Sequence, residues 1–329
     1  MMLSRVAENL FWIGRYMERA ENVARLVDVA RRMSALPREI GRPLSNEWSS
    51  VLIAAGSRDH FGEAIERVDL ESAVDHLMFD KENPSSVINC ITSARENARS
   101  VRFALTRDCW ESLNGAWSVI RHKNPSDARG SGLSNLIDWV IAQSAQFRGA
   151  FYGTMVRDDT FSFTRLGMAI ERVDSTARLL DVKYHVLLPS SGDVGSSADH
   201  YQWLSLLQAA AAHRAYTAMR ADDVSAYGVA DFLILEPRFP RSILHNVRGI
   251  KGVVGDLESY YDFISPCHEE VVSFVNELRS LTVESIISQG LHEFLTEVIE
   301  RNYGLATRLS QAYGFLPVVG DAATTDENQ

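Results

Sequence analysis

The chain has 329 residues, of which 46% are hydrophobic, so it is long enough for about two domains and can bury a substantial core. Its net charge of −10 argues against nucleic acid as a general partner. No apolar run approaches the roughly 18 residues that a membrane helix needs, and Glu8 lies too early for a signal peptide, so we expect a cytoplasmic protein that binds no membrane.

Apolar residues recur every three or four positions over residues 3–30, which predicts an amphipathic helix. The Asn-Pro-Ser-Ser sequence is a helix-start signal, in which we expect Asn83 to be the N-cap and Pro84 the first helical residue. Pro240 is expected to open a helix in the same way, and the β-rich sequence at 182–188 is interpreted as a helix end. Further helices are expected at 48–66, 133–152, 203–219 and 269–299, the last broken near its Ser-Gln-Gly sequence. The predicted fold class is therefore all-α.

The sequence of residues 14–29 is repeated at 167–182, with eight of sixteen positions identical at an offset of 153. Ordinary residue usage gives roughly one match by chance. Two further segment pairs match at offsets of 155 and 156: 47–56 with 202–211, and 79–88 with 235–244. A nearly constant offset over separated segments indicates an internal duplication.

The duplication predicts two tandem, pseudo-equivalent helical bundle repeats, with copy one at residues 1–155 and copy two at 156–316. Trp48 and Trp203 should then occupy equivalent places in the two copies. The remaining residues, 317–329, end in an acidic sequence and are expected to be disordered.

The repeated helix carries charged residues whose signs are retained in both copies. At roughly 100° per residue, four of them fall in one sector of roughly 80° in each copy. These charge-stripe residues are Glu18, Glu21, Arg25 and Asp28 in copy one, and Glu171, Asp174, Arg178 and Asp181 in copy two. Arg19 and Arg172 also recur but point roughly a quarter turn away. Three interpretations stay open: a solvated face, an ion-pair network at the interface between the copies, or a site in which Glu18 or Glu171 acts as a catalytic acid or base.

Retention of charge signs favours burial, because a face in water tolerates exchange between polar residues. We therefore predict that the charge stripes meet at the interface between the copies. A pseudo-twofold axis would bring Glu18 near Arg178, and Arg25 near Glu171. The glycine that begins each repeat, one turn before the glutamate, would let the two helices approach closely.

A second polar stripe occurs in copy one only. Arg95, Arg99 and Arg102 are spaced by four and three residues, so they share one face of a helix. Together with Glu96 and Asn97 they form a candidate site for an anion or a partner. The alternative, which we favour, is that these arginines pair with the acidic charge-stripe residues of copy one.

The loop Glu-Pro-Arg-Phe-Pro-Arg-Ser at 236–242 is another candidate site for an anion or an acidic partner. The free N–H groups of the helix that follows attract negative charge. Arg238 and Arg241 flank this position, Phe239 could cover it, and Ser242 ends the motif. The alternative is an ordinary loop between two helices.

Motifs for familiar chemistry are absent. No histidine follows a glutamate by three residues, and there is no Walker A loop and no nucleophile elbow. Three cysteines without paired spacing predict neither a zinc site nor a disulfide framework. We therefore expect no metal and no cofactor, and no tight binding of ATP by this chain alone.

Several motifs together resemble the alpha-E domain family of bacteria. The resemblance rests on MLSRVAENLFWIGRYMERAENVARLVDV, NPSSV, ARENARSVR, LGMAIERVDSTARLLDV and FPRSI, and it runs from residue 3 to about 315. It implies an all-helical protein without an established activity, typically encoded beside a circularly permuted ATP-grasp protein and a transglutaminase-like protease. The family's recurring polar positions correspond here to Arg5, Glu8, Asn9, Arg15, Glu18, Arg19, Glu21, Arg25, Asp28, Arg95, Glu96, Asn97, Arg99, Glu171, Arg172, Arg178, Arg238 and Arg241.

The resemblance implies two alternative functions. The favoured one is a non-catalytic partner or scaffold of an ATP-grasp amide or peptide ligase, with a transglutaminase-like protein as a further partner, in the synthesis or modification of a peptide-like product. The alternative is an enzyme of the same pathway that uses Glu18 or Glu171 on an amide or peptide substrate. A homo-oligomer is left open.

Overall fold

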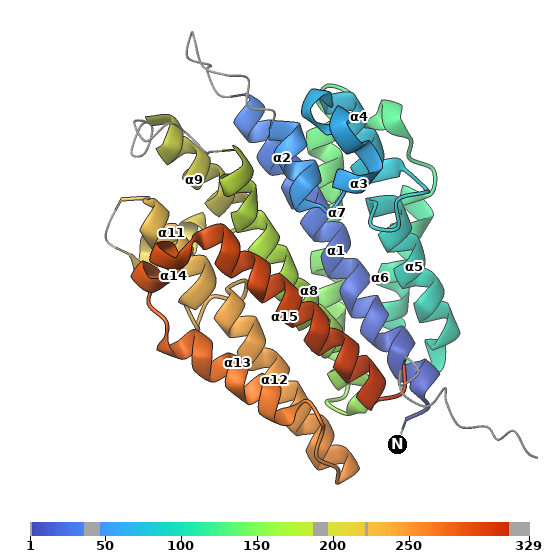
Figure 1. Ribbon diagram of the computed structural model, residues 1–329. Helices are drawn as coiled ribbons and strands as arrows, with labels where there is room; N and C mark the ends of the chain where they lie inside the picture. Colours follow the sequence, from blue (N-terminus) through green and yellow to red (C-terminus); the bar gives the residue numbers. More distant parts are fainter. Residues whose placement is uncertain (1, 36–46, 187–196, 221–222, 316–329) are drawn as a thin grey trace, which may run out of the picture.

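The computed structural model describes residues 2–35, 47–186, 197–220 and 223–315, and within these ranges it is all-helical, without a strand (Figure 1). The all-α fold class is therefore confirmed. The expectations for the tail at 317–329 and for the end of the sequence at 182–188 lie wholly or partly outside the described residues.

Long helices form the frame of the molecule. They are α1 (Ser4–Ser34), α5 (Val87–Ser100), α6 (Arg107–Ile120), α7 (Gly132–Thr154), α8 (Asp159–Val186), α12 (Ile243–Tyr261), α13 (His268–Ser280) and α15 (Leu291–Ala312). Shorter elements connect or cover them. These are α2 (Glu47–Ala54), α3 (Arg58–Phe61), η1 (Gly62–Arg67), α4 (Leu70–Val74), η2 (Asp75–Phe79), η3 (Arg102–Ala104), η4 (Pro125–Ala128), α9 (Ser197–Ala209), α10 (His213–Met219), α11 (Ala226–Leu235) and α14 (Val283–Gln289).

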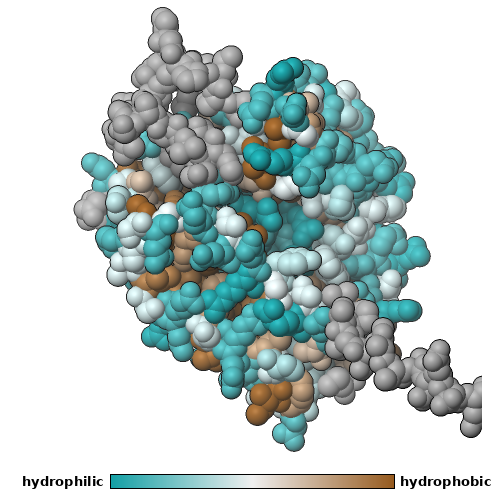
Figure 2. All heavy atoms as spheres, in the orientation of Figure 1, coloured by the Kyte–Doolittle hydropathy of each residue, from teal (hydrophilic) through white to brown (hydrophobic). Residues whose placement is uncertain are grey.

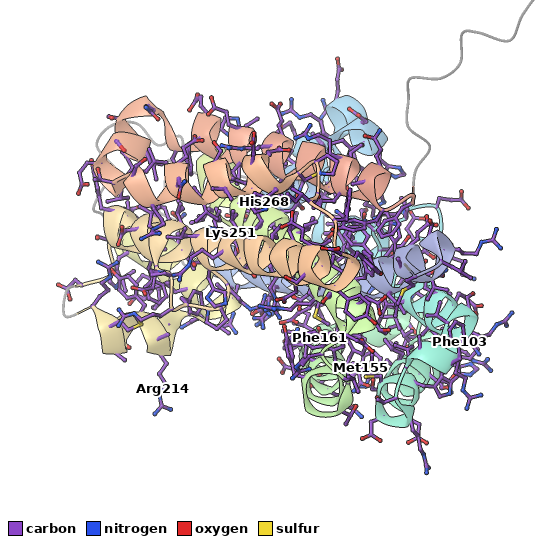
Figure 3. The ribbon with its side chains drawn as sticks, turned by 90° about the horizontal axis from the view of Figure 1, so that it is seen from below. Phe103, Met155, Phe161, Arg214, Lys251 and His268 are labelled. Atoms are coloured by element: carbon purple, nitrogen blue, oxygen red, sulfur yellow. The ribbon has the colours of Figure 1, made fainter. Side chains whose placement is uncertain are left out.

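The long helices pack in two groups that meet along α1 and α8. In the first group α1 packs against α5 and α7, and α6 packs against both of these. In the second group α8 packs against α12 and α15, while α13 packs against α12. Ion pairs from Arg301 to Glu277 and from Arg308 to Glu270 join α15 to α13. Seen from below, the helices of the second group lie to one side of α8 and those of the first group to the other (Figure 3). The α1–α8 contact is therefore the centre of the molecule.

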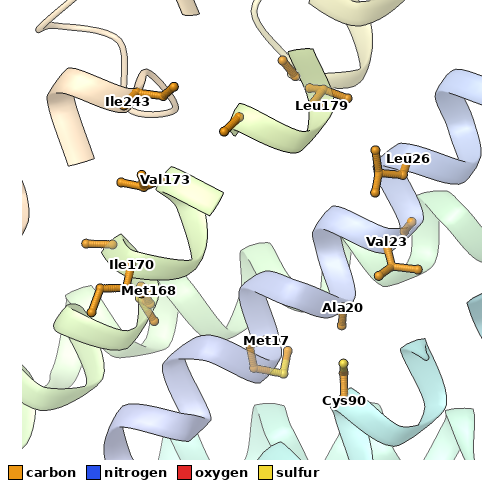
Figure 4. Packing of buried hydrophobic residues seen from close by; sticks show 14 of the residues in the cluster. Met17, Ala20, Val23, Leu26, Cys90, Met168, Ile170, Val173, Leu179 and Ile243 are labelled. Atoms are coloured by element: carbon orange, nitrogen blue, oxygen red, sulfur yellow. The ribbon is translucent and has the colours of Figure 1, made fainter. Parts of the chain in front are cut away.

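Apolar side chains of α1 and α8 fill the core around this contact. Met17, Ala20, Val23 and Leu26 follow one another at helical spacing along α1 and are all buried. In Figure 4 Ala20 lies toward Cys90 of α5, which is fully buried. Burying a large aliphatic side chain stabilises the fold by roughly 1.5–3 kcal/mol. Burial of these residues fixes α1 between its neighbours, and the charged side chains of α1 therefore also lie between helices.

Residues with positive φ and a capping threonine divide three of the expected helices. The segment expected at 48–66 breaks at Gly56, whose φ of 77° is left-handed. The segment at 203–219 breaks between α9 and α10, where Ala211 has a φ of 53°. The segment at 269–299 breaks at Gly290, as expected, and also before α14, where Thr282 is the N-cap. Single uninterrupted helices were therefore the wrong prediction for the first two segments.

The N-cap prediction at the Asn-Pro-Ser-Ser sequence was wrong by three residues. Asn83 and Pro84 form a turn, in which the Asn83 side chain accepts a hydrogen bond from the Ser85 amide at 3.0 Å. Helix α5 begins after it, and its N-cap is Ser86. Likewise Pro240 lies in a turn before α12, and the N-cap of α12 is Ser242. Serine follows proline by two residues in both places, and its hydroxyl accepts a hydrogen bond from the helical amide three residues later.

We expect Ser86→Ala and Ser242→Ala each to lower the free energy of unfolding by about 1 kcal/mol or more, because each removes an N-cap. Ser242 should have the larger effect, since its buried hydroxyl also donates to the Glu236 carbonyl oxygen at 2.5 Å. Urea denaturation would measure both values. Alanine at the exposed Ser118 is the control, and equal costs at all three positions would contradict the assignment of the caps.

Two further observations complete the fold. All three cysteines are buried and unpaired, and burial raises the pKa of Cys90 to about 12, so its thiol is protonated at neutral pH. Among the described residues, no long helix carries an apolar stretch sufficient to traverse a lipid bilayer.

Candidate functional site

The two repeated glycines bring α1 and α8 into backbone contact. A Cβ atom added at Gly14 would overlap the carbonyl oxygen of Thr164, and one added at Gly167 would overlap the carbonyl oxygen of Phe11. Thr164 and Phe11 each precede a repeated glycine by three residues, so the two contacts are reciprocal. The close approach predicted from the glycines is confirmed.

Next to this contact, each helix pairs its glutamate with an arginine of the other helix. Arg19 of α1 donates two hydrogen bonds to Glu171 of α8, from Nε at 2.6 Å and from Nη2 at 3.0 Å. Arg172 of α8 donates from Nη2 to Glu18 of α1 at 2.6 Å. Arg15 adds a further bond to Glu171 at 2.8 Å. Consecutive glutamate and arginine residues therefore cross the α1–α8 interface in both directions.

Glu21, one turn further along α1, is the centre of a buried cluster of charges. Arg25 donates to its carboxylate from Nε at 2.9 Å and from Nη2 at 2.7 Å, and Arg148 of α7 and Arg241 also bond to it. Arg148 reaches Glu18 as well, at 3.2 Å. With Arg172, the cluster sets four guanidinium groups around the carboxylates of Glu18 and Glu21, so positive charge is in excess.

Arg25 and Arg178 make matching contacts at the end of the interface. Arg178 donates to Asp174, one turn before it, at 2.7 Å and to the carbonyl oxygen of Ala54 at 3.0 Å. Arg25 likewise bonds to Glu21 one turn before it and to the carbonyl oxygen of Ala209. Each arginine thus ties its own helix to the last residue of α2 or α9.

The predicted pairs between Glu18 and Arg178, and between Arg25 and Glu171, are wrong. The partners are Arg172 for Glu18, and Arg15 and Arg19 for Glu171. The helical wheel had placed Arg19 and Arg172 away from the interface. Because an arginine side chain is long and flexible, it can return from a quarter turn away to a carboxylate on a helix this close.

Arginines lower the pKa values of Glu171 and Glu21. Burial alone would raise the pKa of Glu171, but the guanidinium groups of Arg19 and Arg15 outweigh it and lower the pKa to about 2. The pKa of Glu21 is also well below its usual range, because Arg241, Arg25 and Arg148 outweigh burial. For Arg241, burial and the nearby guanidinium of Arg25 lower the pKa to about 10 against the opposing effect of Glu21.

These shifts predict loss of stability in acid. A carboxyl group whose pKa is lower in the folded state stabilises the fold above its unfolded pKa, and this contribution is lost as the pH falls through the folded pKa. For Glu171 that window runs from 4.5 down to about 2. We expect urea denaturation across this window to give a falling free energy of unfolding, with a shallower fall in Glu171→Gln. An unchanged slope in the variant would contradict the assignment.

The last charge-stripe residues lie outside the network. Asp28 accepts from Arg31 at 2.7 Å and from Arg32 at 2.6 Å, both on its own helix. Asp181 accepts from His292, at the start of α15, at 2.6 Å. The structure therefore brings together the glutamates and arginines of the two stripes and leaves their final aspartates at the end of each helix.

The predicted arginine stripe is divided between two elements, because α5 ends at Ser100 and Arg102 begins η3, so the expectation that all three arginines share one helix was wrong. Arg95 and Arg102 face tryptophans of α6, so the favoured pairing with the acidic charge-stripe residues of copy one was also wrong. Arg95 lies 4.4 Å from the ring centre of Trp117 and 5.6 Å from that of Trp110, and Arg102 lies 5.0 Å from Trp110. Aromatic faces attract guanidinium groups in this geometry. Arg99 is exposed. The flanking residues Glu96, which pairs with Arg95 and Arg99, and Asn97, which is half-buried, share this helix.

The loop at 236–242 is occupied by its own contacts. Arg238 is exposed and donates to Glu236 at 2.8 Å, while Phe239 is buried against Phe232. Ser242 caps α12, and Arg241 turns inward to Glu21. Arg241 therefore joins this loop to the charge cluster around Glu21. The Ser242 side chain, and not an anion, accepts a hydrogen bond from a free amide at the start of α12.

Two features of the site escaped sequence reasoning. Arg148 bonds to both Glu18 and Glu21, but it lies on a helix that the duplication search had not matched. The position of the second feature, a cleft of about 340 Å³ beside Glu171, depends on the packing of five separate segments. It is lined by Trp12, Arg15, Arg19, Asn22, Val23, Leu26, Ala55, Ser85, Glu171, Asp174, Arg178 and Tyr303. Figure 2 shows a hydrophilic hollow near the middle of this face.

One group of side chains has the composition of a metal site. Ligand atoms of His60, His76 and Asp80 lie within 4.8 Å of one another. His76 already uses both ring nitrogens, Nδ1 with Asp80 at 3.0 Å and Nε2 with Ser57 at 3.1 Å. The geometry is that of a hydrogen-bonded histidine on which the exposed His60 ring stacks at 4.3 Å.

Comparison with known families finds one match over nearly the whole chain. Residues 2–313 match the family model Alpha-E, described as a predicted alpha-helical domain with a conserved ER motif. The chain belongs to the Alpha-E family. Glu-Arg pairs at 18–19 and 171–172 are the two that cross the α1–α8 interface, so in this Alpha-E domain they join the two central helices.

Relatives among curated proteins are uncharacterised. One from Mycobacterium bovis is 25% identical over 96% of this chain, and two from Mycobacterium tuberculosis strains are 25% and 24% identical over the same share. The chain spans 38% of the length of each of these proteins. No solved structure matches.

Proposed function

We propose that this Alpha-E protein is a non-catalytic helical partner of an ATP-grasp-type ligase that makes or modifies a peptide-like product. The observation that carries the proposal is the state of Glu18 and Glu171. Both carboxylates are buried and bonded to arginines of the chain itself. A group with a pKa of about 2, as Glu171 has, is ionised at neutral pH, so it has no proton to donate, and it is a weak base because the arginines stabilise its charge. The Glu-Arg pairs then serve the architecture.

The proposal includes an internal duplication. It is supported by the reciprocal contacts at Gly14 and Gly167, by the crossed Glu-Arg pairs, and by the matching bonds of Arg25 and Arg178. The helix order supports it as well, because the long helices α1, α5, α6 and α7 come in the same order along the chain as α8, α12, α13 and α15. Two related halves give a partner one broad, rigid surface.

A docking surface for the ligase is proposed at the lower end of the molecule. Tyr261 donates to Asp159 at 2.7 Å and accepts from the Met2 amide at 3.3 Å, so the ends of α12, α8 and α1 meet there. Large apolar side chains are exposed around this end: Leu3, Phe103, Val156, Tyr260 and Ile264. Figure 3 views this end and shows Phe103 at its edge. Exposed apolar groups gathered in one region are typical of a protein interface.

The length of the relatives supports a partner role. About three fifths of each mycobacterial protein lies outside the part matched by this chain. A helical module of this size that recurs inside longer chains is suited to work beside another domain.

The second candidate is an enzyme of the same pathway. Glu171 favours it in one respect, because its carboxylate lines the cleft of about 340 Å³ together with Arg15 and Arg19. Against it, the same two arginines hold the carboxylate ionised and bonded. A catalytic role would require the substrate to displace them.

Co-purification with an ATP-grasp protein of the kind typically encoded beside Alpha-E proteins tests the proposal. We expect retention by the wild-type chain and loss of retention in the double variant Phe103→Ser, Ile264→Ser. The control is Tyr201→Ser, which removes an exposed aromatic side chain from α9 at the other end of the molecule. Absence of retention, or hydrolysis or ligation of a peptide by the purified chain alone, would refute a non-catalytic partner role.

A further inference from the structure

The two faces of the α1–α8 interface differ in what occupies them. On one face Glu21 receives Arg25, Arg148 and Arg241, and the space around its carboxylate is filled. On the other face Asp174, which is 153 residues after Glu21, receives only Arg178 among the residues that the structure describes, and it borders the cleft of about 340 Å³. The cleft therefore lies where the opposite face holds arginine side chains.

Two substitutions explain why the cleft is open. Ser85 lies 156 residues before Arg241, at the same place in the proline-containing turn, and its short side chain leaves Asp174 uncovered. Ala306 takes the place of Arg148, because Asn302 bonds to the carbonyl oxygen of Ile170, 153 residues after Met17, just as Ser144, four residues before Arg148, bonds to that of Met17. Tyr303 is exposed at the edge of the cleft. This face therefore lacks the two cations that the opposite face holds.

The remaining arginines keep hydrogen-bond donors for a ligand. Arg15 uses only Nε, Arg19 uses Nε and Nη2, and Arg178 uses Nε and Nη1 in bonds to the residues that the structure describes. Four guanidinium nitrogens therefore have no bonded acceptor among the described residues. The acceptors of the cleft are already engaged, Glu171 by two arginines and Asp174 by one.

We propose that this cleft binds the carboxylate of a small molecule about the size of an amino acid or dipeptide. Three guanidinium groups and two carboxylates leave one positive charge, which matches a monoanion and disfavours a phosphate dianion. Arginine is suited to bind a carboxylate through paired N–H groups. Trp12, Val23 and Leu26 supply an apolar wall for the rest of the ligand. The volume lies at the low end of the roughly 300–1,000 Å³ of small-molecule sites.

This binding site goes beyond the partner role, because its ligand binds the chain whether or not another protein docks. It lies against α1, α8 and α15, away from the apolar side chains at the lower end. Failure of either proposal therefore leaves the other standing.

Isothermal titration of the purified full chain tests the site with N-acetyl-alanyl-alanine as the probe. Its C-terminal amide, which lacks the charge, is the comparison ligand, and inorganic phosphate is a third. We expect the carboxylate to bind about ten-fold or more tightly than the amide, as loss of a charge-assisted bond predicts. The Trp12 indole N–H signal should shift with saturation in NMR spectra.

The variant Ser85→Arg provides the sharpest test, since it restores the cation found at the equivalent position of the filled face. We expect it to cover Asp174 and abolish binding while the chain stays folded. Ser118→Arg adds the same charge at an exposed position of α6 and should leave binding unchanged. Arg178→Lys should weaken binding about ten-fold, whereas Arg25→Lys, which alters the matching contacts on the filled face, should leave it unchanged.

Three outcomes would overturn the proposal. They are equal binding of the carboxylate and the amide, phosphate binding as tight as that of the carboxylate, and undiminished binding in a folded Ser85→Arg variant. Thermal unfolding of each variant establishes that it is folded. If Arg178→Lys or Arg25→Lys does not fold, the comparison of Ser85→Arg with Ser118→Arg still decides the test.

Discussion

Glu171→Ala should destabilise the protein by about 3–5 kcal/mol, the typical cost of removing one member of a buried ion pair. The carboxylate is 3% exposed and accepts three hydrogen bonds from Arg15 and Arg19. Removing it leaves two guanidinium groups in a partly buried site without their anion, and they repel each other. Chemical denaturation of the variant and the wild type would measure the loss.

A double-mutant cycle with Arg19→Ala separates the pair from its surroundings. Because Arg19 loses its main partner in Glu171→Ala, the double variant should cost less than the two single variants added together. The control is the pair of Arg107 and Glu111 on α6, whose side chains are 85% and 56% exposed. Glu111→Ala should cost under about 1 kcal/mol. Strict additivity at Glu171 and Arg19 would show that the crossed pair is not coupled.

Gly167→Ala is expected to cost about 3 kcal/mol or more, the upper part of the range for overpacked sites. The new methyl group would overlap the carbonyl oxygen of Phe11 and make a tight contact with the backbone nitrogen of Arg15, and backbone atoms cannot rotate away as a side chain can. The helices would have to separate, and the crossed pairs of Glu18 and Glu171 would lengthen with them. Gly14→Ala should behave alike, because its contact with Thr164 is the reciprocal one.

Gly149→Ala is the matched control for the glycine variants. Gly149 also lies inside a long helix, α7, but an added Cβ meets no atom within 4 Å. Alanine there should stabilise the protein by about 0.5–1 kcal/mol through its better helix propensity. Thermal or urea unfolding of the three variants gives the comparison. A cost at Gly167 no larger than the change at Gly149 would contradict a tight backbone contact.

Sequence reasoning predicted the helices of the core well, because a helix that buries one face has apolar residues at every third or fourth position. Residues 3–30 and 133–152 correspond to α1 and α7 with ends shifted by a few residues. Helix starts were predicted less accurately where we took proline as the first helical residue, because Pro84 and Pro240 lie in turns before the capping serines. The breaks at Gly56 and Ala211 depend on backbone angles that no periodicity records.

For the candidate site, the sequence indicated which charges matter better than how they pair. Repetition drew attention to Glu18 and Glu171, and the structure places both at the α1–α8 interface. A helical wheel gives only the direction in which a side chain leaves the helix and not how far it can bend, so it placed Arg19 and Arg172 away from the interface. Arg148 was missed because nothing in its own segment distinguishes it until α7 packs beside α1.

The crossed Glu-Arg pairs have a consequence for how such a chain could arise. Each central helix presents the same three kinds of residue, glycine, glutamate and arginine, to a partner that presents them in return. A surface that complements itself in this way is the defining property of an isologous dimer interface. A half-length ancestor with one Glu-Arg pair could therefore have assembled as a symmetric homodimer. Fusion of two copies would then have freed each half to change separately, one to fill its face with arginines and the other to open a cleft.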